Sequence, residues 1–152
     1  MPEQTGRTAL VTGANSGLGY QTTLALAGKG ARVVMACRDE ERAKEAREEI
    51  LRSLPEADLE LLVVDLASLD SIRDASRAYL DRHNQLDMLI NSAGIMAPPR
   101  TETQDGFELQ FGVNHLGHFA LTGQLLPRLL ETPKSRVVTV TSTAHKFARI
   151  DF

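Results

Sequence analysis

The sequence of 152 residues is short of cysteine, of long apolar runs and of net charge, and each shortage excludes something. Cys37 is the only cysteine, so an intrachain disulfide is excluded. The apolar runs, such as 61–64 and 137–140, are far shorter than the roughly 20 residues that span a bilayer. Residues 1–7 contain no apolar segment of the kind that a signal peptide needs. We therefore expect a cytoplasmic protein that does not cross a membrane.

Charge and composition further limit the class of protein and its possible partners. The 17 Lys and Arg residues and the 20 Asp and Glu residues are interspersed and leave a net charge of -3, so no basic surface indicates nucleic acid or an anionic membrane as a partner. Apolar residues make up 42% and charged residues 24%, which is typical of a folded globular chain. Because the sequence has no repeat or low-complexity linker, residues 1–152 are expected to form one domain.

Strand-like and helix-like segments alternate along the chain. Short β-branched runs, nearly continuous in apolar character, predict buried strands at 8–12, 31–36, 59–64, 88–91 and 136–141. Apolar spacing and capping residues predict helices at 17–27, after Asp39, after the N-cap Ser68, and at 103–131, where Pro127 interrupts the last. This alternation predicts an α/β fold with a doubly wound parallel sheet. Ligands of such sheets bind beyond the carboxyl ends of the strands.

The first strand leads through a glycine-rich turn, Thr12-Gly13-Ala14-Asn15-Ser16-Gly17-Leu18-Gly19, into a helix. Glycines permit a tight turn and a close approach to a phosphate, and the helix N-terminus offers N–H groups to an anion. The turn therefore predicts a dinucleotide phosphate site formed by Gly13, Asn15, Ser16, Gly17, Leu18 and Gly19. The spacing departs from the commoner Gly-x-Gly-x-x-Gly, since Thr22 stands where the third glycine would be.

The second strand ends at the neutral Cys37, followed by Arg38 and Asp39. A cationic side chain here accommodates the 2′-phosphate of NADP, whereas a carboxylate accepts the ribose 2′-OH of NAD. Arg38 therefore favours NADP, and NAD bound through Asp39 is the alternative. Cys37 is interpreted as a small buried residue rather than a reactive thiol. The third strand ends at Asp65 and Leu66, where a carboxylate either accepts from the adenine amino group or simply begins a helix.

Small and amide residues follow the fourth strand, as Asn91-Ser92-Ala93-Gly94. Small side chains let the backbone lie against a cofactor, and the Asn91 amide can brace neighbouring strands. We predict that Asn91, Ala93 and Gly94 contribute to cofactor binding, with a simple turn as the alternative.

The predicted helix at 103–131 places Asn114 on a stripe that begins with Phe107 and Phe111. An amide on an apolar face must be hydrogen-bonded, so Asn114 is expected to have a specific task. His115 and His118 are three residues apart, but no third ligand is placed by the sequence. We therefore predict no metal site.

Taken in order, these motifs resemble the short-chain dehydrogenase/reductase family. Their particular residues look most like its retinol-dehydrogenase-like branch. The resemblance is carried by Thr-Gly-x-x-x-Gly-x-Gly, by Asp65, by Asn-Ser-Ala-Gly at 91–94, by Val-Asn-His-Leu-Gly-His-Phe at 113–119, and by the strand that leads to Ser142. It implies a Rossmann fold with strand order 3-2-1-4-5 and a nucleotide-binding oxidoreductase. It also implies that Ser142 and Asn114 are catalytic, that Asn114 holds a water near the catalytic Lys, and that Asp65 contacts adenine.

The family's proton donor, a Tyr in Tyr-x-x-x-Lys, has no counterpart, because Tyr20 and Tyr79 are the only tyrosines and neither has Lys four residues on. We therefore expect a truncated N-terminal cofactor-binding portion of an NADP(H)-dependent oxidoreductase, with an alcohol or carbonyl substrate, whose fifth strand is an exposed edge. The alternative is a non-catalytic dinucleotide-binding or regulatory module. A second copy of the chain, in a homo-oligomer, is a further expected partner.

Overall fold

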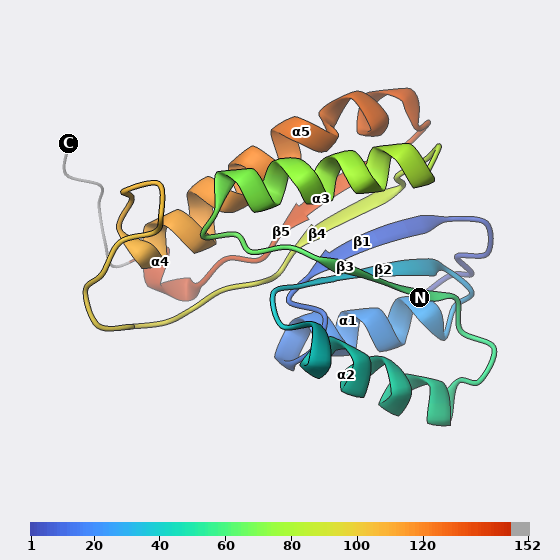
Figure 1. Ribbon diagram of the computed structural model, residues 1–152. Coiled ribbons are helices and arrows are strands. Elements are labelled where there is room, and N and C mark those ends of the chain that lie inside the picture. The colour runs from blue at the N-terminus through green and yellow to red at the C-terminus, as the bar shows by residue number, and fades with distance from the viewer. Residues whose placement is uncertain (147–152) are drawn as a thin grey trace.

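The computed structural model describes residues 1–146 and contains one parallel sheet of five strands in the order β3-β2-β1-β4-β5 (Figure 1). This confirms the expected doubly wound α/β fold and its strand order. The strands are β1 (Thr8–Thr12), β2 (Arg32–Cys37), β3 (Leu59–Val63), β4 (Met88–Asn91) and β5 (Arg136–Thr139). The helices are α1 (Gly17–Ala27), α2 (Glu40–Ser53), α3 (Leu69–Arg82), α4 (Leu109–Phe111), the π-helix η1 (Gly112–Gly117), α5 (His118–Glu131) and the short 3-10 helix η2 (Thr143–Lys146).

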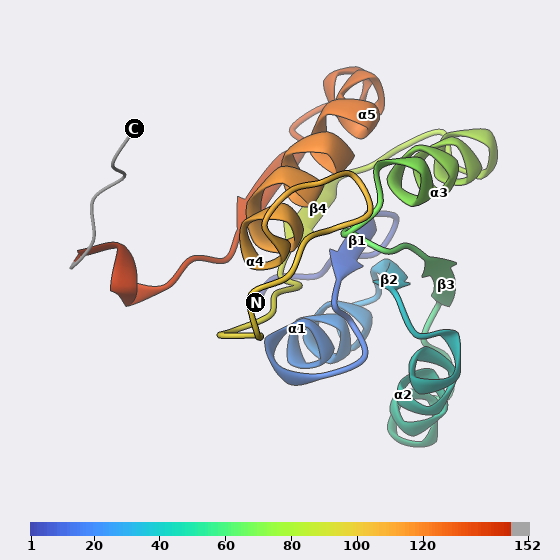
Figure 2. The ribbon, with the colours of Figure 1, turned by 60° about the vertical axis from the view of Figure 1, so that its left-hand side comes forward.

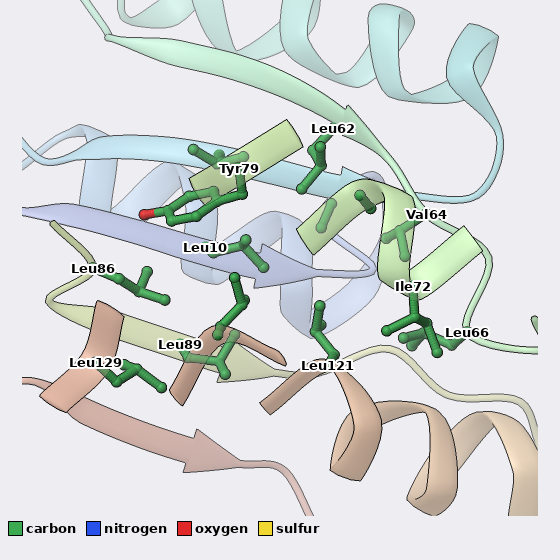
Figure 3. Packing of buried hydrophobic residues seen from close by; sticks show 14 of the residues in the cluster. Leu10, Leu62, Val64, Leu66, Ile72, Tyr79, Leu86, Leu89, Leu121 and Leu129 are labelled. Carbon is green, nitrogen blue, oxygen red and sulfur yellow. The ribbon is translucent and has the colours of Figure 1, made fainter. Parts of the chain in front are cut away.

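Helices cover both faces of the sheet. Helices α1 and α2 lie on one face and α3 and α5 on the other, as Figures 1 and 2 show from two directions. Successive side chains of a strand point to opposite faces, so Ala9 and Val11 pack with α1 and α2 while Leu10 packs with α3 and α5. Figure 3 shows this second core, in which Leu10 and Leu89 face Leu121 and Leu129 of α5. Within residues 1–146, no helix has the length and apolarity that a bilayer crossing requires.

The predicted N-cap Ser68 is confirmed, and the structure adds a second N-cap, Asp39. The Ser68 hydroxyl accepts a hydrogen bond from the Ser71 amide at 3.2 Å, and the Asp39 carboxylate accepts one from the Arg42 amide at 3.1 Å. Each satisfies an N–H group that the first helical turn otherwise leaves without a partner. These caps set where α3 and α2 begin, just beyond the carboxyl ends of β3 and β2.

The prediction that all five strands are buried is wrong for β5. Val137 and Val138 are 44% and 47% exposed, because β5 pairs only with β4 and no described helix covers it. The strand also ends at Thr139 rather than at residue 141. The expectation of an exposed edge at the fifth strand is therefore confirmed for the described residues.

The predicted single helix at 103–131 is wrong in its first part. Residues 103–108 form a turn in which Gly106 has φ +81°, and the Thr103 hydroxyl accepts from the amides of Asp105 and Phe107. Such local bonds compete with helix formation. The Glu108 carboxylate then accepts from the amides of Gln110 and Phe111, so the helix begins only at Leu109.

The helix also changes its winding before it reaches α5. Residues 112–117 form a π-helix, which rotates the following side chains away from the stripe that a 3.6-residue period predicts. Phe107 and Phe111 are 39% and 53% exposed, so the predicted apolar stripe is not buried. Helix α5 then continues through Pro127, and burial of Leu121, Leu125 and Leu129 offsets the hydrogen bond that the proline removes.

Candidate functional site

A cleft of about 770 Å³ opens at the carboxyl ends of β1 to β4. Most of the predicted cofactor-binding residues line it together, although they come from four separate strand ends. The lining comprises Thr12, Gly13, Asn15, Ser16, Gly17, Leu18, Gly19, Ala36, Cys37, Arg38, Asp39, Arg42, Val64, Asp65, Leu66, Ser92, Ala93, Gly94, Ile95 and Val113. The parallel topology thus brings to one edge of the sheet residues as distant in sequence as Thr12 and Val113.

The glycine turn is packed too closely for side chains at two positions. Gly13 has φ +65°, and a Cβ on it would lie 2.9 Å from the Cα of Ala93. A Cβ on Gly19 would lie 2.3 Å from the carbonyl oxygen of Gly13. The side chain of the N-cap residue Ser16 makes no cap hydrogen bond within the described chain. The turn therefore presents bare backbone and the amide end of α1 to the cleft.

The residue after β2 and the first turn of α2 each present a cation to the cleft. Arg38 and Arg42 both line it and are exposed, whereas the carboxylate of Asp39 accepts the Arg42 amide as the N-cap of α2. Arg42 was missed by sequence reasoning, although its position in the first turn after Arg38 could have indicated it. Burial raises the pKa of the Cys37 thiol to about 11, which agrees with its interpretation as a small buried residue.

The segment after β3 forms the opposite wall of the cleft. One oxygen of Asp65 accepts from the Ala67 amide at 2.9 Å, so part of this carboxylate shapes the turn into α3. Leu66 is buried beneath the cleft, and Gly117 of η1 packs against it so tightly that a Cβ there would lie 2.4 Å from the Leu66 carbonyl oxygen. This close approach brings the π-helix to the cleft floor.

The residues after β4 divide into two groups. Ala93 and Gly94 line the cleft, as predicted for cofactor binding. Asn91 does not: it is buried, and its amide donates to the hydroxyls of Thr122 at 3.1 Å and Thr139 at 3.4 Å. The structure therefore places Asn91 as a brace between β4, α5 and β5, the second task that its amide suggested.

The two predicted catalytic residues lie outside the cleft lining. Asn114 is exposed rather than buried, and its side chain is engaged by the backbone of Ile95: it accepts from the amide at 2.9 Å and donates to the carbonyl at 2.8 Å. Its predicted pairing is thus confirmed, while its predicted burial is wrong. Ser142 follows the end of β5 and is exposed, and its carbonyl accepts from the His145 amide at 3.2 Å.

A buried polar cluster behind the cleft was also missed. The Thr12 hydroxyl accepts from the amides of Ser92 and Ala93 at 2.9 and 3.0 Å, and it lies 2.9 Å from Nε2 of His118. Burial lowers the pKa of His118, and the hydrogen bond to the Asn114 carbonyl opposes part of that shift. The only sequence signal was a threonine at the end of an apolar strand. Among the described residues, no group of three or more His, Cys, Asp or Glu side chains could hold a metal ion.

Comparison with known proteins identifies the family of the chain. The family model for short chain dehydrogenases matches residues 7–152. Retinol dehydrogenase 13 from Homo sapiens is 45% identical over 97% of this chain and 44% of its own length. A crystal structure of an uncharacterized protein from Mycobacterium Paratuberculosis is 47% identical, with a TM-score of 0.83 over 95% of this chain and 49% of that chain.

A third similarity concerns the fold alone. A short chain dehydrogenase from Escherichia coli CFT073 complexed with NADPH is 24% identical, with a TM-score of 0.82 over 95% of this chain and 62% of that chain. The chain spans about half the length of the curated relatives that it matches. Because the family model covers nearly all of it, the chain belongs to the short-chain dehydrogenase/reductase family, in the retinol-dehydrogenase-like branch that its motifs resemble.

Proposed function

We propose that the cleft binds NADP(H), and that the chain is the cofactor-binding portion of an oxidoreductase that interconverts an alcohol and a carbonyl compound. The observation that carries this proposal is the crowded glycine turn, where a Cβ on Gly13 or Gly19 would collide with backbone atoms. Backbone this close, at the amide end of a helix, suits a pyrophosphate. NADP(H), when bound, supplies the hydride at C4 of its nicotinamide.

The preference for NADP over NAD is argued from the end of β2. A carboxylate at this place favours NAD by accepting the ribose 2′-OH, and one oxygen of Asp39 already accepts from the Arg42 amide as the N-cap of α2. Arg38 and Arg42 both border the cleft and can donate charge-assisted hydrogen bonds to a 2′-phosphate. Asp65 is assigned to the adenine amino group, since its turn bond to Ala67 uses one oxygen.

The catalytic assignments remain those of the family resemblance. Ser142 orients the substrate oxygen, and Asn114 acts through the water that its helix segment holds. The retinol dehydrogenase relatives favour a lipophilic alcohol or aldehyde as the substrate class of the longer protein. The second candidate, a dinucleotide-binding module without catalysis, is favoured by the positions of Ser142 and Asn114, which lie outside the cleft lining. We expect a cytoplasmic location in either case.

Calorimetric titration with NADPH and NADH tests the cofactor proposal. Arg38→Ala and Arg42→Ala should each weaken NADPH binding by about tenfold and leave NADH binding nearly unchanged, because each removes one charge-assisted hydrogen bond. Arg77→Ala is the matched control, since Arg77 is exposed on α3 and does not line the cleft. Equal affinities for NADPH and NADH in the unaltered chain would contradict the preference, and no binding of either would contradict the function.

A further inference from the structure

A buried polar cluster joins β1, β4 and the helix that carries Asn114. At its centre are the Thr12 hydroxyl and the imidazole of His118, which are 1% and 4% exposed. A buried hydroxyl facing a buried imidazole is costly unless every donor meets an acceptor. The hydrogen bonds at these two side chains therefore decide where their protons are.

The oxygen of Thr12 has more neighbours than a hydroxyl can accept from. A hydroxyl has one hydrogen to donate and two lone pairs. The backbone amides of Ser92 and Ala93, at 2.9 and 3.0 Å, can only donate, so they use both lone pairs. Nε2 of His118 lies 2.9 Å away, whereas the other neighbour, the Ile90 carbonyl, lies 3.4 Å away. The hydroxyl hydrogen therefore points to Nε2, which must be an acceptor.

This fixes the protonation of the second ring nitrogen. A neutral imidazole with an accepting Nε2 carries its proton on Nδ1. Nδ1 lies 3.0 Å from the carbonyl oxygen of Asn114, to which it donates. Asn114 belongs to the π-helix, where the ordinary i to i+4 hydrogen bonds are shifted. The histidine side chain thus supplies a donor to a carbonyl at the irregular turn.

We propose that His118, neutral and protonated on Nδ1, is a positioning residue that holds the end of β4 and the Asn114 turn in one arrangement. Through Thr12 it orients the lone pairs that bind the Ser92 and Ala93 amides at the cleft wall. Through the Asn114 carbonyl it fixes the turn whose side chain holds Ile95. The proposal adds a positioning residue to the proposed function. It rests on that function only in expecting His118 to affect NADP(H) binding.

His115, in the adjoining π-helix η1, provides a matched comparison. It precedes His118 by three residues, is exposed, and stacks on Phe111 with ring centroids 5.1 Å apart. It does not line the cleft. Replacing either histidine by phenylalanine removes the ring nitrogens and keeps an aromatic side chain, but only the change at 118 removes hydrogen bonds to Thr12 and Asn114.

The first test is the imidazole tautomer in the unaltered chain, read at neutral pH from long-range proton–nitrogen NMR correlations. We expect Nδ1 of His118 to be protonated and Nε2 to be unprotonated. A neutral ring protonated on Nε2, or a doubly protonated ring, would overturn the proposal. Because this measurement uses no substitution and no cofactor, it decides the point whether or not the variants fold and whether or not NADP(H) binds.

The second test is amide hydrogen exchange in His118→Phe and His115→Phe. In His118→Phe the amides of Ser92, Ala93 and Ile95 should exchange about three- to tenfold faster relative to the Val34 amide, because each depends on the hydrogen bonds removed. Val34 lies in the interior strand β2, between β1 and β3, and reports global unfolding. Acceleration of all four amides by the same factor, or of none, would show a merely structural role and refute the positioning role.

NADPH titration of the same variants connects the residue to the cleft. His118→Phe should weaken NADPH binding by about three- to tenfold, and His115→Phe should leave it within twofold. If the unaltered chain binds no NADPH, the proposed function fails while the tautomer and exchange results still judge His118. If NADPH binds equally to all three proteins, the cofactor stands and the positioning role is wrong.

Discussion

Gly19→Ala isolates the effect of crowding in the glycine turn. Gly19 lies in helix α1, where alanine is the best helix former, so the substitution carries no backbone strain. The added Cβ would lie 2.3 Å from the Gly13 carbonyl oxygen, 2.7 Å from the Gly13 carbonyl carbon and 3.1 Å from the Thr12 carbonyl oxygen. All three contacts are with backbone atoms, so relief requires the turn or the helix to move by about 1 Å.

The magnitude follows from two opposing terms. Overpacking of this kind costs about 1 to 3 kcal/mol, and contacts this short belong at the upper end. The better helix propensity of alanine offsets about 1 kcal/mol. We therefore expect the free energy of unfolding to fall by about 2 kcal/mol, which lowers the urea midpoint by about 1 M. Since the same shift displaces the amides that face the phosphate, NADPH affinity should fall by about tenfold or more.

Urea unfolding followed by circular dichroism, together with NADPH fluorescence titration, measures both effects. Gly123→Ala is the control, because a Cβ on Gly123, also in a helix, would meet no atom within 4 Å. It should raise the free energy of unfolding by about 0.5 to 1 kcal/mol and leave NADPH binding unchanged. A Gly19→Ala protein as stable as Gly123→Ala, with unaltered NADPH affinity, would refute the reasoning from close backbone approach.

Three further outcomes are expected. Burial lowers the pKa of His118, so the unfolded state binds more protons than the native state below the ordinary histidine pKa of about 6.5, and stability should fall as pH drops through that value. His118→Phe should abolish this part of the pH dependence of the urea midpoint, whereas retention of the full slope would contradict it. The 152-residue chain should not oxidise NADPH with aldehydes or ketones, because Tyr79 is buried with its hydroxyl donating to the Gln85 carbonyl, and its pKa is raised by burial. Turnover that Ser142→Ala abolishes would disprove this. The exposed edge strand β5 should make the isolated chain associate, so light scattering should rise with concentration, and Val138→Lys should reduce it; a monomer at every concentration would count against an open edge.

The fold class and most of the cleft lining follow from local patterns in the sequence. Strand β1, strand β4 and helix α1 have the predicted bounds, because continuous β-branched runs and glycine stops are local signals. Parallel topology then brings the carboxyl ends of those strands to one edge, so Gly13, Arg38 and Ala93 could be assigned to one cleft before any distance was known.

Other details depend on particular hydrogen bonds and packing contacts that hydrophobic periodicity does not predict. The turn at 103–108 and the π-helix at 112–117 defeat a 3.6-residue period, because local side-chain bonds at Thr103 and close packing of Gly117 on Leu66 override helix propensity. Asn91 braces β4 because Thr122 and Thr139, which accept from its amide, come from α5 and β5. Thr12 and His118 are 106 residues apart in sequence, so no local pattern predicts their contact. The direction of the Thr12 hydroxyl proton depends on the two amides that surround the same oxygen in the folded chain.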